Sequence, residues 1–159
     1  VYGIRTCALR LTNTYGPRMR VKDARQTFLG IWIKNLVEGK RIEVWGDGLQ
    51  IRDFNYVDDV TDAMLMAALS EKSNGQIYNL GSPDRVNLKD LASLMIKVHG
   101  KGDFEVIPFP EDRKPIDIGD YYADYSKIKD ALNWNPRLSL EQGLAGTLRY
   151  YYEFMNEYL

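Results

Sequence analysis

The 159-residue chain carries 21 basic and 22 acidic side chains, so its formal net charge is -1 at pH 7. Nucleic acids and anionic membranes select proteins with a basic excess, and this balance excludes both as the main partner. The length suits one domain or part of one, and no apolar run approaches the roughly 20 residues that span a bilayer. The single cysteine, Cys7, permits no internal disulfide, so we expect a reducing, cytoplasmic compartment.

The first predicted element is a buried strand over residues 4–11. Alternating and continuous apolar residues are mixed there, and the run stops at a loop that contains Gly16 and Pro17. A buried strand needs a neighbour on each side to satisfy its backbone groups, yet only three residues precede it. We therefore expect residues 1–16 to supply a terminal strand to a sheet whose other strands lie outside this chain, and the chain to be cut from a longer protein.

Helical and strand periods alternate over the remaining residues, which predicts an α/β protein. The predicted strands cover residues 42–45, 51–57, 76–80 and 104–107. The predicted helices cover residues 27–37 and begin near 58, 87, 126 and 139. Asn87 and Ser126 are the expected caps of two helices, Asp58 and Asp59 form the cap and first turn of another, and Ser139-x-x-Gln142 forms a capping box. Residues 108–120 form a charged loop rich in proline.

Two signals for chemistry are rejected, and a third is missing. None of the 13 glycines falls in a Gly-x-Gly-x-x-Gly pattern between a strand and a helix, so this chain lacks a complete dinucleotide phosphate site. His99 has no ligand-spaced partner and is interpreted as a helix-end or surface histidine, not a metal ligand. Tyr125 and Lys129 match Tyr-x-x-x-Lys, but Ser126 is expected to cap the helix, so no helix runs through the tyrosine to align the pair.

Three segments carry positive signals, each with an ordinary alternative. Asn13, which follows a predicted strand, would point into the crevice where open α/β sheets bind ligands, or it forms a turn before Gly16-Pro17. Arg52, on a strand after a glycine turn, offers a planar fork that suits phosphate, or it is a surface arginine paired with Asp53 or Asp58. Arg113 and Lys114 form an anion clamp beside Pro115, or a solvated loop.

The order of these motifs closely resembles the C-terminal half of the extended short-chain dehydrogenase/reductase family, over essentially all 159 residues. The motifs are Arg-Leu-x-Asn-x-Tyr-Gly-Pro from residue 10, Gly-Asp-Gly-x-x-x-Arg-Asp-Phe-x-Tyr-Val-Asp-Asp-Val from residue 46, Tyr-Asn-Leu-Gly from residue 78, and Ala-Asp-x-Ser-Lys-x-x-x-x-Leu-Asn-Trp-x-Pro from residue 123. Within the family, the chain most resembles enzymes of the UDP-glucose 4-epimerase and dTDP-glucose 4,6-dehydratase types.

The resemblance implies a fold and a division of labour. The fold would be the C-terminal part of an extended Rossmann-type enzyme: the last strands and helices of the parallel sheet plus the smaller substrate-binding domain. The N-terminal half would bind NAD, carry the catalytic Ser/Thr and Tyr-x-x-x-Lys, and supply the helices of a homodimer. A Tyr-Gly-Ile segment like the one at Tyr2 follows the catalytic pair in the family, so we expect no catalytic residue in this chain.

Carried over position by position, the diphosphate of a nucleotide sugar would be held by three parts of the chain. Asn13 would hydrogen-bond to it, Arg52 would clamp it, and the pair Arg113-Lys114 would close from the other side. Many epimerases have arginine where this chain has Lys114, so either member of the pair is a candidate, and Lys114 would act as a point charge without the bidentate fork.

The other ends of the ligand have their own expected contacts. Phe28 and Leu29 would line the nucleotide pocket. Glu43 and Trp45 would meet the nucleobase, largely through backbone groups. Three further contacts follow from the resemblance: Asp117 would accept a ribose hydroxyl, Tyr121 would bound the sugar, and Leu11 would lie near the nicotinamide carboxamide of NAD.

The resemblance implies the nucleotide-sugar-binding portion of an NAD-dependent epimerase for UDP- or dTDP-sugars, most often acting through a 4-keto sugar. A 4,6-dehydratase or a decarboxylase of the same family is the alternative within the class. From another class, the chain is a non-catalytic nucleotide-sugar-binding or assembly module, which predicts a stable fragment that binds UDP or dTDP without NAD.

Overall fold

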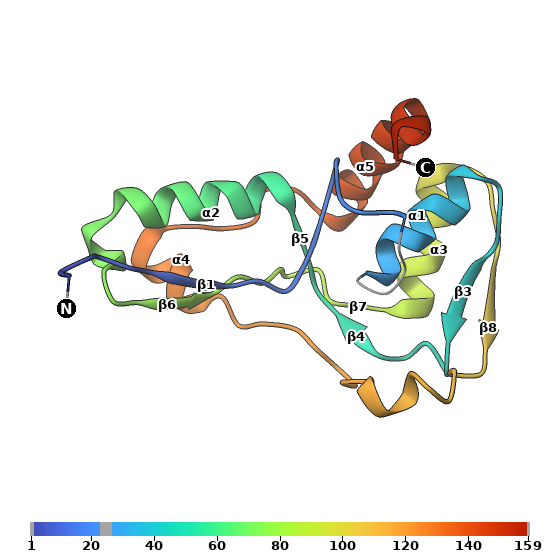
Figure 1. Ribbon diagram of the computed structural model, residues 1–159, viewed down its shortest axis with the longest axis horizontal. Coiled ribbons are helices and arrows are strands. Elements are labelled where there is room, and N and C mark those ends of the chain that lie inside the picture. Colours follow the sequence, from blue (N-terminus) through green and yellow to red (C-terminus); the bar gives the residue numbers. More distant parts are fainter. Residues whose placement is uncertain (1, 23–26, 159) are drawn as a thin grey trace.

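The computed structural model describes residues 2–22 and 27–158, and Figure 1 shows an elongated molecule in which strands and helices mix. Its strands are β1 Ala8–Arg10, β2 Asn13–Tyr15, β3 Ile42–Trp45, β4 Ile51–Arg52, β5 Phe54–Tyr56, β6 Ile77–Asn79, β7 Val86–Asn87 and β8 Phe104–Ile107. Its α-helices are α1 Phe28–Val37, α2 Val57–Leu69, α3 Leu88–His99, α4 Ser126–Leu132 and α5 Leu140–Phe154. The 3₁₀ turns are η1 Glu71–Ser73, η2 Lys114–Ile116 and η3 Met155–Glu157.

The strands pair in twos. β1 lies parallel to β6, β2 to β5 and β3 to β8, whereas β4 and β7 are antiparallel. The α/β class is therefore confirmed, and the short strand β7 is an element that the sequence period did not indicate. In Figure 1 the pair β3–β8 closes one end of the molecule beside α1 and α3, while β1 and β6 lie below α2 at the other end.

The predicted strand over residues 4–11 is shorter and more exposed than expected. Only Ala8–Arg10 pair with β6, and Ile4 is 75% exposed. The chain then leaves the pair at Leu11 and starts β2 at Asn13, so the described residues 2–16 hold two strands and not the one predicted for residues 1–16. Among the described residues β1 has a partner on one side only, which accounts for the exposure of its side chains.

The strand predicted over residues 51–57 is interrupted at Asp53. β4 ends at Arg52, β5 begins at Phe54, and the two pair with different strands, β7 and β2. The helix that follows starts at Val57 with Tyr56 as its N-cap, so Asp58 and Asp59 stand in the first turn and do not cap it. Acidic side chains are favourable there because they face the positive end of the helix dipole.

The larger core lies among α1, α3, α5 and β3. Ile42 and Val44 alternate with the exposed Glu43 and turn inward, and Leu91 and Met95 meet them from α3. Asn87 caps α3 as predicted: its side-chain oxygen accepts from the backbone N–H of Asp90 at 2.8 Å.

Helix α5 covers this core and begins with the predicted capping box. The Ser139 N–H donates to the Gln142 side chain at 3.0 Å, and the Gln142 N–H donates to the Ser139 hydroxyl at 3.3 Å. The buried Tyr15 hydroxyl donates to the carbonyl of Leu140 at 3.4 Å, and burial raises the pKa of Tyr15 far above its ordinary value. Tyr151 of this helix is fully buried, whereas its neighbour Tyr152 is 68% exposed.

A smaller core joins α2, α4 and β6 around the buried Trp134, whose indole donates to the carbonyl of Asp59 at 3.0 Å. Ser126 is the first residue of α4 and not its cap. The cap position is Tyr125, and the Asp124 carboxylate accepts from the Ser126 N–H at 2.8 Å. The Tyr125 ring packs edge-on against Trp134 at 5.9 Å between centroids, so this tyrosine is part of the core packing.

No helix among the described residues is both long enough and apolar enough to cross a membrane.

Candidate functional site

A pocket of about 270 Å³ opens between α1, β3 and the segment after β8. Four of its residues come from one stripe of α1 at helical spacing, and the rest come from β3, β4, the turn between them, Leu88 and residues 109–118. The lining residues are Phe28, Ile31, Trp32, Asn35, Glu43, Trp45, Gln50, Arg52, Leu88, Phe109, Arg113, Asp117 and Ile118. Six of them, Phe28, Glu43, Trp45, Arg52, Arg113 and Asp117, are residues that the sequence singled out.

Arg52 is the most constrained polar residue of this pocket, since it is only 9% exposed. Its Nη1 donates to the carbonyl of Ile51 at 2.9 Å and to the carbonyl of Gly119, and its Nη2 lies 3.9 Å from the Asp117 carboxylate. Burial lowers the pKa of the guanidinium, against the opposing effect of Asp117 and Asp120. Because 3.9 Å is too long for a direct hydrogen bond, the buried guanidinium retains the capacity to bind an anion.

These contacts overturn the alternative interpretation of Arg52. No side-chain contact with Asp53 or Asp58 is found among the described residues: Asp58 is exposed, and the Asp53 carboxylate accepts from the backbone N–H groups of Ser82 and Ala123. Arg52 is therefore buried beside a pocket rather than paired on the surface.

The loop that contacts Arg52 is aligned along β4 by hydrogen bonds to the backbone of Ile51. The Ile51 N–H donates to the Asp120 carboxylate at 2.8 Å, and the Tyr121 N–H donates to the Ile51 carbonyl at 2.9 Å. Arg52 and Tyr121 form a parallel bridge. Residues 117–121 thus run beside β4, which fixes the Gly119 carbonyl and Asp117 against the guanidinium.

Aromatic rings form the walls on either side. Phe28 and Trp32 meet edge to face at 5.1 Å on α1, and Trp45 meets Phe109 edge to face at 5.7 Å. An aromatic slot with one buried cation suits a ligand that has a flat ring and an anionic group.

The strand β3 offers backbone groups to the same pocket. The N–H groups of Ile42 and Gly46 donate to the carbonyls of Asp103, just before β8, and of Ile107 in β8. In a parallel pair the backbone groups of Glu43 and Trp45 therefore point to the opposite edge of β3. The Trp32 indole donates to the Glu43 carbonyl at 3.1 Å and covers part of that edge. The Glu43 side chain itself is exposed, in keeping with a role through the backbone.

The two neighbouring cations of the loop are separated by the fold. Arg113 lines the pocket and its Nε lies 3.4 Å from the Asp112 carboxylate, while Lys114 is exposed and does not line it. Both backbone N–H groups donate to the Pro110 carbonyl, a tight turn that sends the two side chains different ways.

Four other predicted site residues lie outside the pocket lining. Leu29 is 2% exposed in the larger core, so its expected place in the nucleotide pocket is wrong: it is next to Phe28 on a helix and turns the other way. Asn13 starts β2 and donates through Nδ2 to the Asp53 carbonyl at 3.0 Å, so it is not the turn residue of its alternative. Leu11 and Tyr121 are 36% and 44% exposed.

The sequence prediction missed seven lining residues, Ile31, Trp32, Asn35, Gln50, Leu88, Phe109 and Ile118. The signal for three of them was present, since residues 28, 31, 32 and 35 follow the i, i+3, i+4, i+7 spacing of one helix face. Gln50 also has a buried side-chain oxygen without a hydrogen-bond partner within the described ranges. Only the fold brings it and Phe109 to that face.

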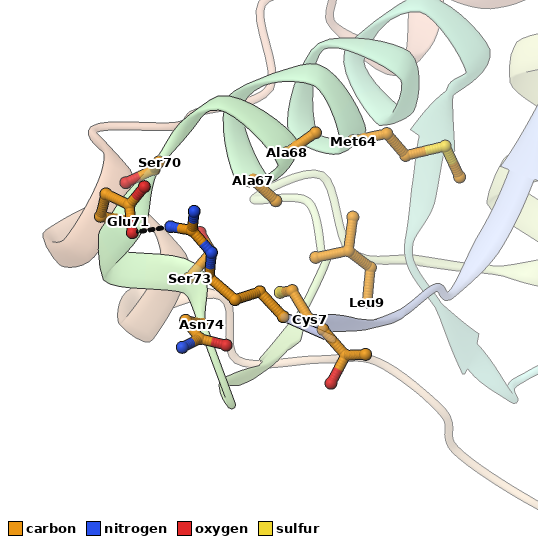
Figure 2. Close-up of a pocket in the computed structure, with 11 residues that line it drawn as sticks. Cys7, Leu9, Met64, Ala67, Ala68, Ser70, Glu71, Ser73 and Asn74 are labelled. Carbon is orange, nitrogen blue, oxygen red and sulfur yellow. Dashed lines mark hydrogen bonds and ion pairs between the residues drawn. The ribbon is translucent and has the colours of Figure 1, made fainter. Parts of the chain in front are cut away.

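A larger hollow of about 760 Å³ lies at the other end of the molecule and contains none of the predicted site residues. Figure 2 shows Leu9 on β1 facing Ala67 and Met64 on α2 across it, with Glu71 at one end. Glu71 forms an ion pair with Arg5, which also lines the hollow. Both members of that pair are well exposed, and no buried cation lies among the residues that line the hollow. The aromatic pocket around Arg52 is therefore the better candidate site.

Residues 1–81 match the model of the NAD dependent epimerase/dehydratase family. The chain is 31% identical to UDP-N-acetyl-alpha-D-glucosaminuronate decarboxylase of Bacillus cytotoxicus, over 98% of this chain and 49% of that protein. It is 30% identical to dTDP-glucose 4,6-dehydratase of Streptomyces griseus, over 96% of this chain and 44% of that protein.

A solved structure is similar over the same extent. The crystal structure of UDP-glucuronic acid 4-epimerase from Bacillus cereus, in complex with UDP-glucuronic acid and NAD, superposes with a TM-score of 0.79 at 30% identity, covering 96% of this chain and 47% of that one. The chain thus spans about half the length of the relatives it matches. On the family match and these likenesses, the chain belongs to the NAD-dependent epimerase/dehydratase family and forms part of its Rossmann-type α/β fold.

Proposed function

We propose that this chain is the nucleotide-sugar-binding portion of an NAD-dependent epimerase that acts on a UDP- or dTDP-sugar. The observation that carries the proposal is the buried Arg52 guanidinium at the wall of an aromatic pocket that Arg113 also lines. The relatives named for UDP- and dTDP-sugars support the same ligand class.

The geometry suggests how such a ligand lies. Its flat base would enter between the aromatic walls and meet the backbone edge of Trp45, where one N–H and one carbonyl side by side match the donor and acceptor of a uracil or thymine edge. Its diphosphate would lie at Arg52, where the two terminal nitrogens can contact phosphate oxygens and displace the weaker interaction with Asp117. Asp117 would then be free to accept a ribose hydroxyl.

The sugar would extend from Arg52 along the bridge to Tyr121 and towards Asn13. Tyr121 is paired with Arg52 through the backbone, so its side chain borders the next part of the ligand. Asn13 donates to the carbonyl of Asp53, the residue that follows Arg52. Anchoring the diphosphate would restrict where the sugar ring can lie, which is the contribution of this chain to the reaction.

We propose that this chain does not by itself form a complete site for NAD. It has no Gly-x-Gly-x-x-Gly phosphate cradle, and Leu11 is the one residue assigned to the cofactor. In the family the cofactor supplies hydride transfer. We place NAD binding and the catalytic tyrosine in the other half of the full-length protein, so this chain would contribute the binding and orientation of the nucleotide sugar.

Epimerisation at C4 is the reaction we propose for the full-length protein. The relatives include 4-epimerases, 4,6-dehydratases and decarboxylases, so dehydration or decarboxylation of the same ligand class is the alternative. A non-catalytic nucleotide-sugar-binding module is the alternative from another class.

The proposal is tested on the full-length protein by titration calorimetry with UDP-glucose, UDP-glucuronic acid and dTDP-glucose, followed by NMR of the products with NAD present. Binding together with an inverted C4 centre is expected. A product that has lost water would indicate a dehydratase, and release of carbon dioxide would indicate a decarboxylase. Binding without turnover would favour the non-catalytic nucleotide-sugar-binding module. Absence of binding for all three ligands would overturn the nucleotide-sugar assignment.

A further inference from the structure

The charged side chain next to Arg52 is fully buried and has no role in the binding scheme above. Asp53 is 0% exposed and occupies the single position between β4 and β5. An ionised carboxylate in the interior is costly unless hydrogen bonds compensate it, so its contacts indicate its function.

Asp53 joins three segments that are far apart in sequence. Its Oδ2 accepts from the backbone N–H of Ser82 at 3.2 Å and from that of Ala123 at 3.1 Å. Its backbone carbonyl accepts from the Asn13 side chain at 3.0 Å. The start of β2, the turn after β6 and the segment after Tyr121 are thus held together at one residue.

The approach of these segments is close enough to require a glycine. A Cβ placed on Gly81 would lie 2.7 Å from the Ala123 carbonyl oxygen and 3.0 Å from Asp53 Oδ2. The loop that carries Tyr121 is therefore pressed against the strand ends at Gly81, and the Asp53 carboxylate provides the hydrogen bonds that keep it there.

The same loop holds Arg52 in place. Residues 117–121 contact Ile51 and Arg52 through the Asp120 carboxylate, the Tyr121 N–H and the Gly119 carbonyl. The bond from Asp53 to Ala123 fastens the end of this run, two residues beyond Tyr121. Without it, Arg52 would keep its charge and lose the fixed position of its carbonyl and carboxylate partners.

We infer that Asp53 is a positioning residue that aligns Asn13, Arg52 and Tyr121 for one ligand by tying their three segments together. The inference rests on the proposed nucleotide-sugar site and adds to it a residue that never touches the ligand. Such supporting hydrogen bonds determine how well a binding group is held in its productive geometry.

The second oxygen of Asp53 makes a conservative substitution informative. Oδ1 is buried and has no hydrogen-bond partner in the described part of the chain. In an Asp53→Asn variant the amide oxygen would still accept from the N–H groups of Ser82 and Ala123. The NH₂ group would take the position of Oδ1, which accepts no hydrogen bond from the described residues, so no existing bond among them would be lost. Asp53→Ala would leave both backbone N–H groups unpaired.

The test compares Asp53→Ala, Asp53→Asn and Gly81→Ala with the wild-type full-length protein. Gly81→Ala acts on the same contact from the other side and keeps the carboxylate. Asp84→Ala is the matched control, because the Asp84 carboxylate also accepts a backbone N–H, that of Leu140 at 2.8 Å, but fastens α5 instead of the loop. The readouts are amide hydrogen exchange without ligand and the Kd for UDP-glucose or dTDP-glucose.

For Asp53→Ala and Gly81→Ala we expect faster exchange confined to residues 81–85 and 117–123, and a Kd raised by about tenfold or more. Asp53→Asn should stay close to the wild type in both hydrogen exchange and Kd. Asp84→Ala should lower the melting temperature without changing the Kd. If both Asp53→Ala and Gly81→Ala exchange in those residues at the wild-type rate, Asp53 does not hold the three segments together. If exchange is faster but the Kd is unchanged, Asp53 holds the segments together without contributing to ligand binding. If the wild-type protein binds no nucleotide sugar, the proposed function fails, whereas the exchange data still test the tie.

Discussion

Arg52 is charged at neutral pH, yet it lies almost wholly inside the protein. The carbonyls of Ile51 and Gly119 satisfy part of its hydrogen-bonding capacity, and Asp117 supplies a carboxylate at 3.9 Å, longer than a direct hydrogen bond. A residue so arranged is held in place by neutral acceptors while its charge is only loosely paired. An anion that reaches it gains from the low polarity of the surroundings, since burial has already removed competing water.

We expect Arg52→Ala in the full-length protein to weaken nucleotide-sugar binding by about 2 kcal/mol, roughly thirtyfold, because a charge-assisted hydrogen bond of that size is lost. The nucleotide-sugar affinity of Arg52→Lys should fall between those of the wild type and Arg52→Ala, since lysine keeps the charge but lacks the planar fork of arginine. NAD affinity should stay the same, and titration calorimetry measures both ligands. Arg137→Ala is the control: Arg137 also contacts two carboxylates, Asp59 and Asp62, but beside the smaller core. Equal nucleotide-sugar affinity in Arg52→Ala and the wild type would remove Arg52 from the site.

At the scale of elements, α5 fits its neighbours through small residues. A Cβ on Gly143 would lie 2.0 Å from the Tyr15 hydroxyl oxygen and 2.8 Å from its ring carbon, while one on Gly146 would meet only the Tyr56 hydroxyl at 3.4 Å. The Tyr15 ring is itself fixed edge to face against Phe54 and Tyr56, so it has little room to give way. The strand pair β2–β5, which carries Asn13, is therefore seated directly under the first turns of α5.

These two glycines make a matched pair. Gly143→Ala should destabilise the protein by about 1–3 kcal/mol through overpacking, although alanine is the better helix former. Gly146→Ala should be neutral or stabilise it by up to about 1 kcal/mol, which is the helix-propensity gain. Urea unfolding followed by circular dichroism measures both. The packing argument is wrong if Gly143→Ala is as stable as Gly146→Ala.

At the scale of the whole molecule, α2 lies at the opposite end from α1 and β3, which line the aromatic pocket (Figure 1). Met64, Leu65 and Leu69 on α2 are 48%, 57% and 87% exposed, and Met64 also lines the hollow beside β1. Neighbouring exposed apolar side chains favour contact with other apolar surfaces. The chain spans about half the length of its relatives, so its behaviour alone and within the full-length protein can be compared.

We expect the 159-residue chain, produced by itself, to bind an apolar fluorescent dye or to self-associate through this side of α2. Leu65→Gln combined with Leu69→Gln should reduce the dye fluorescence and shift the chain towards monomer in size-exclusion chromatography. Leu49→Gln is the control, because Leu49 is 57% exposed at a turn away from α2. Equal dye binding by the double variant and the Leu49→Gln control would show that this surface is not responsible.

Much of the local structure follows from the sequence by itself. The helix predicted over residues 27–37, the strand over residues 42–45, the Asn87 cap and the Ser139 capping box depend on residues within one or two turns of each other, and the structure confirms them. The motifs also indicated the family, and the α/β class follows from the alternation of periods.

Tertiary structure decided what those local patterns leave open. The break at Asp53, the inward turn of Leu29, the choice of Arg113 over Lys114 and the pairing of Arg52 with Asp117 each depend on segments far apart in the chain. Neither hydrophobic period nor capping residues encode which of two adjacent cations faces a pocket, because that depends on the turn at Pro110 and on the strand beside it. The sequence therefore specified most helices and strands and the candidate binding side chains, whereas packing between distant segments determined which of these side chains meet.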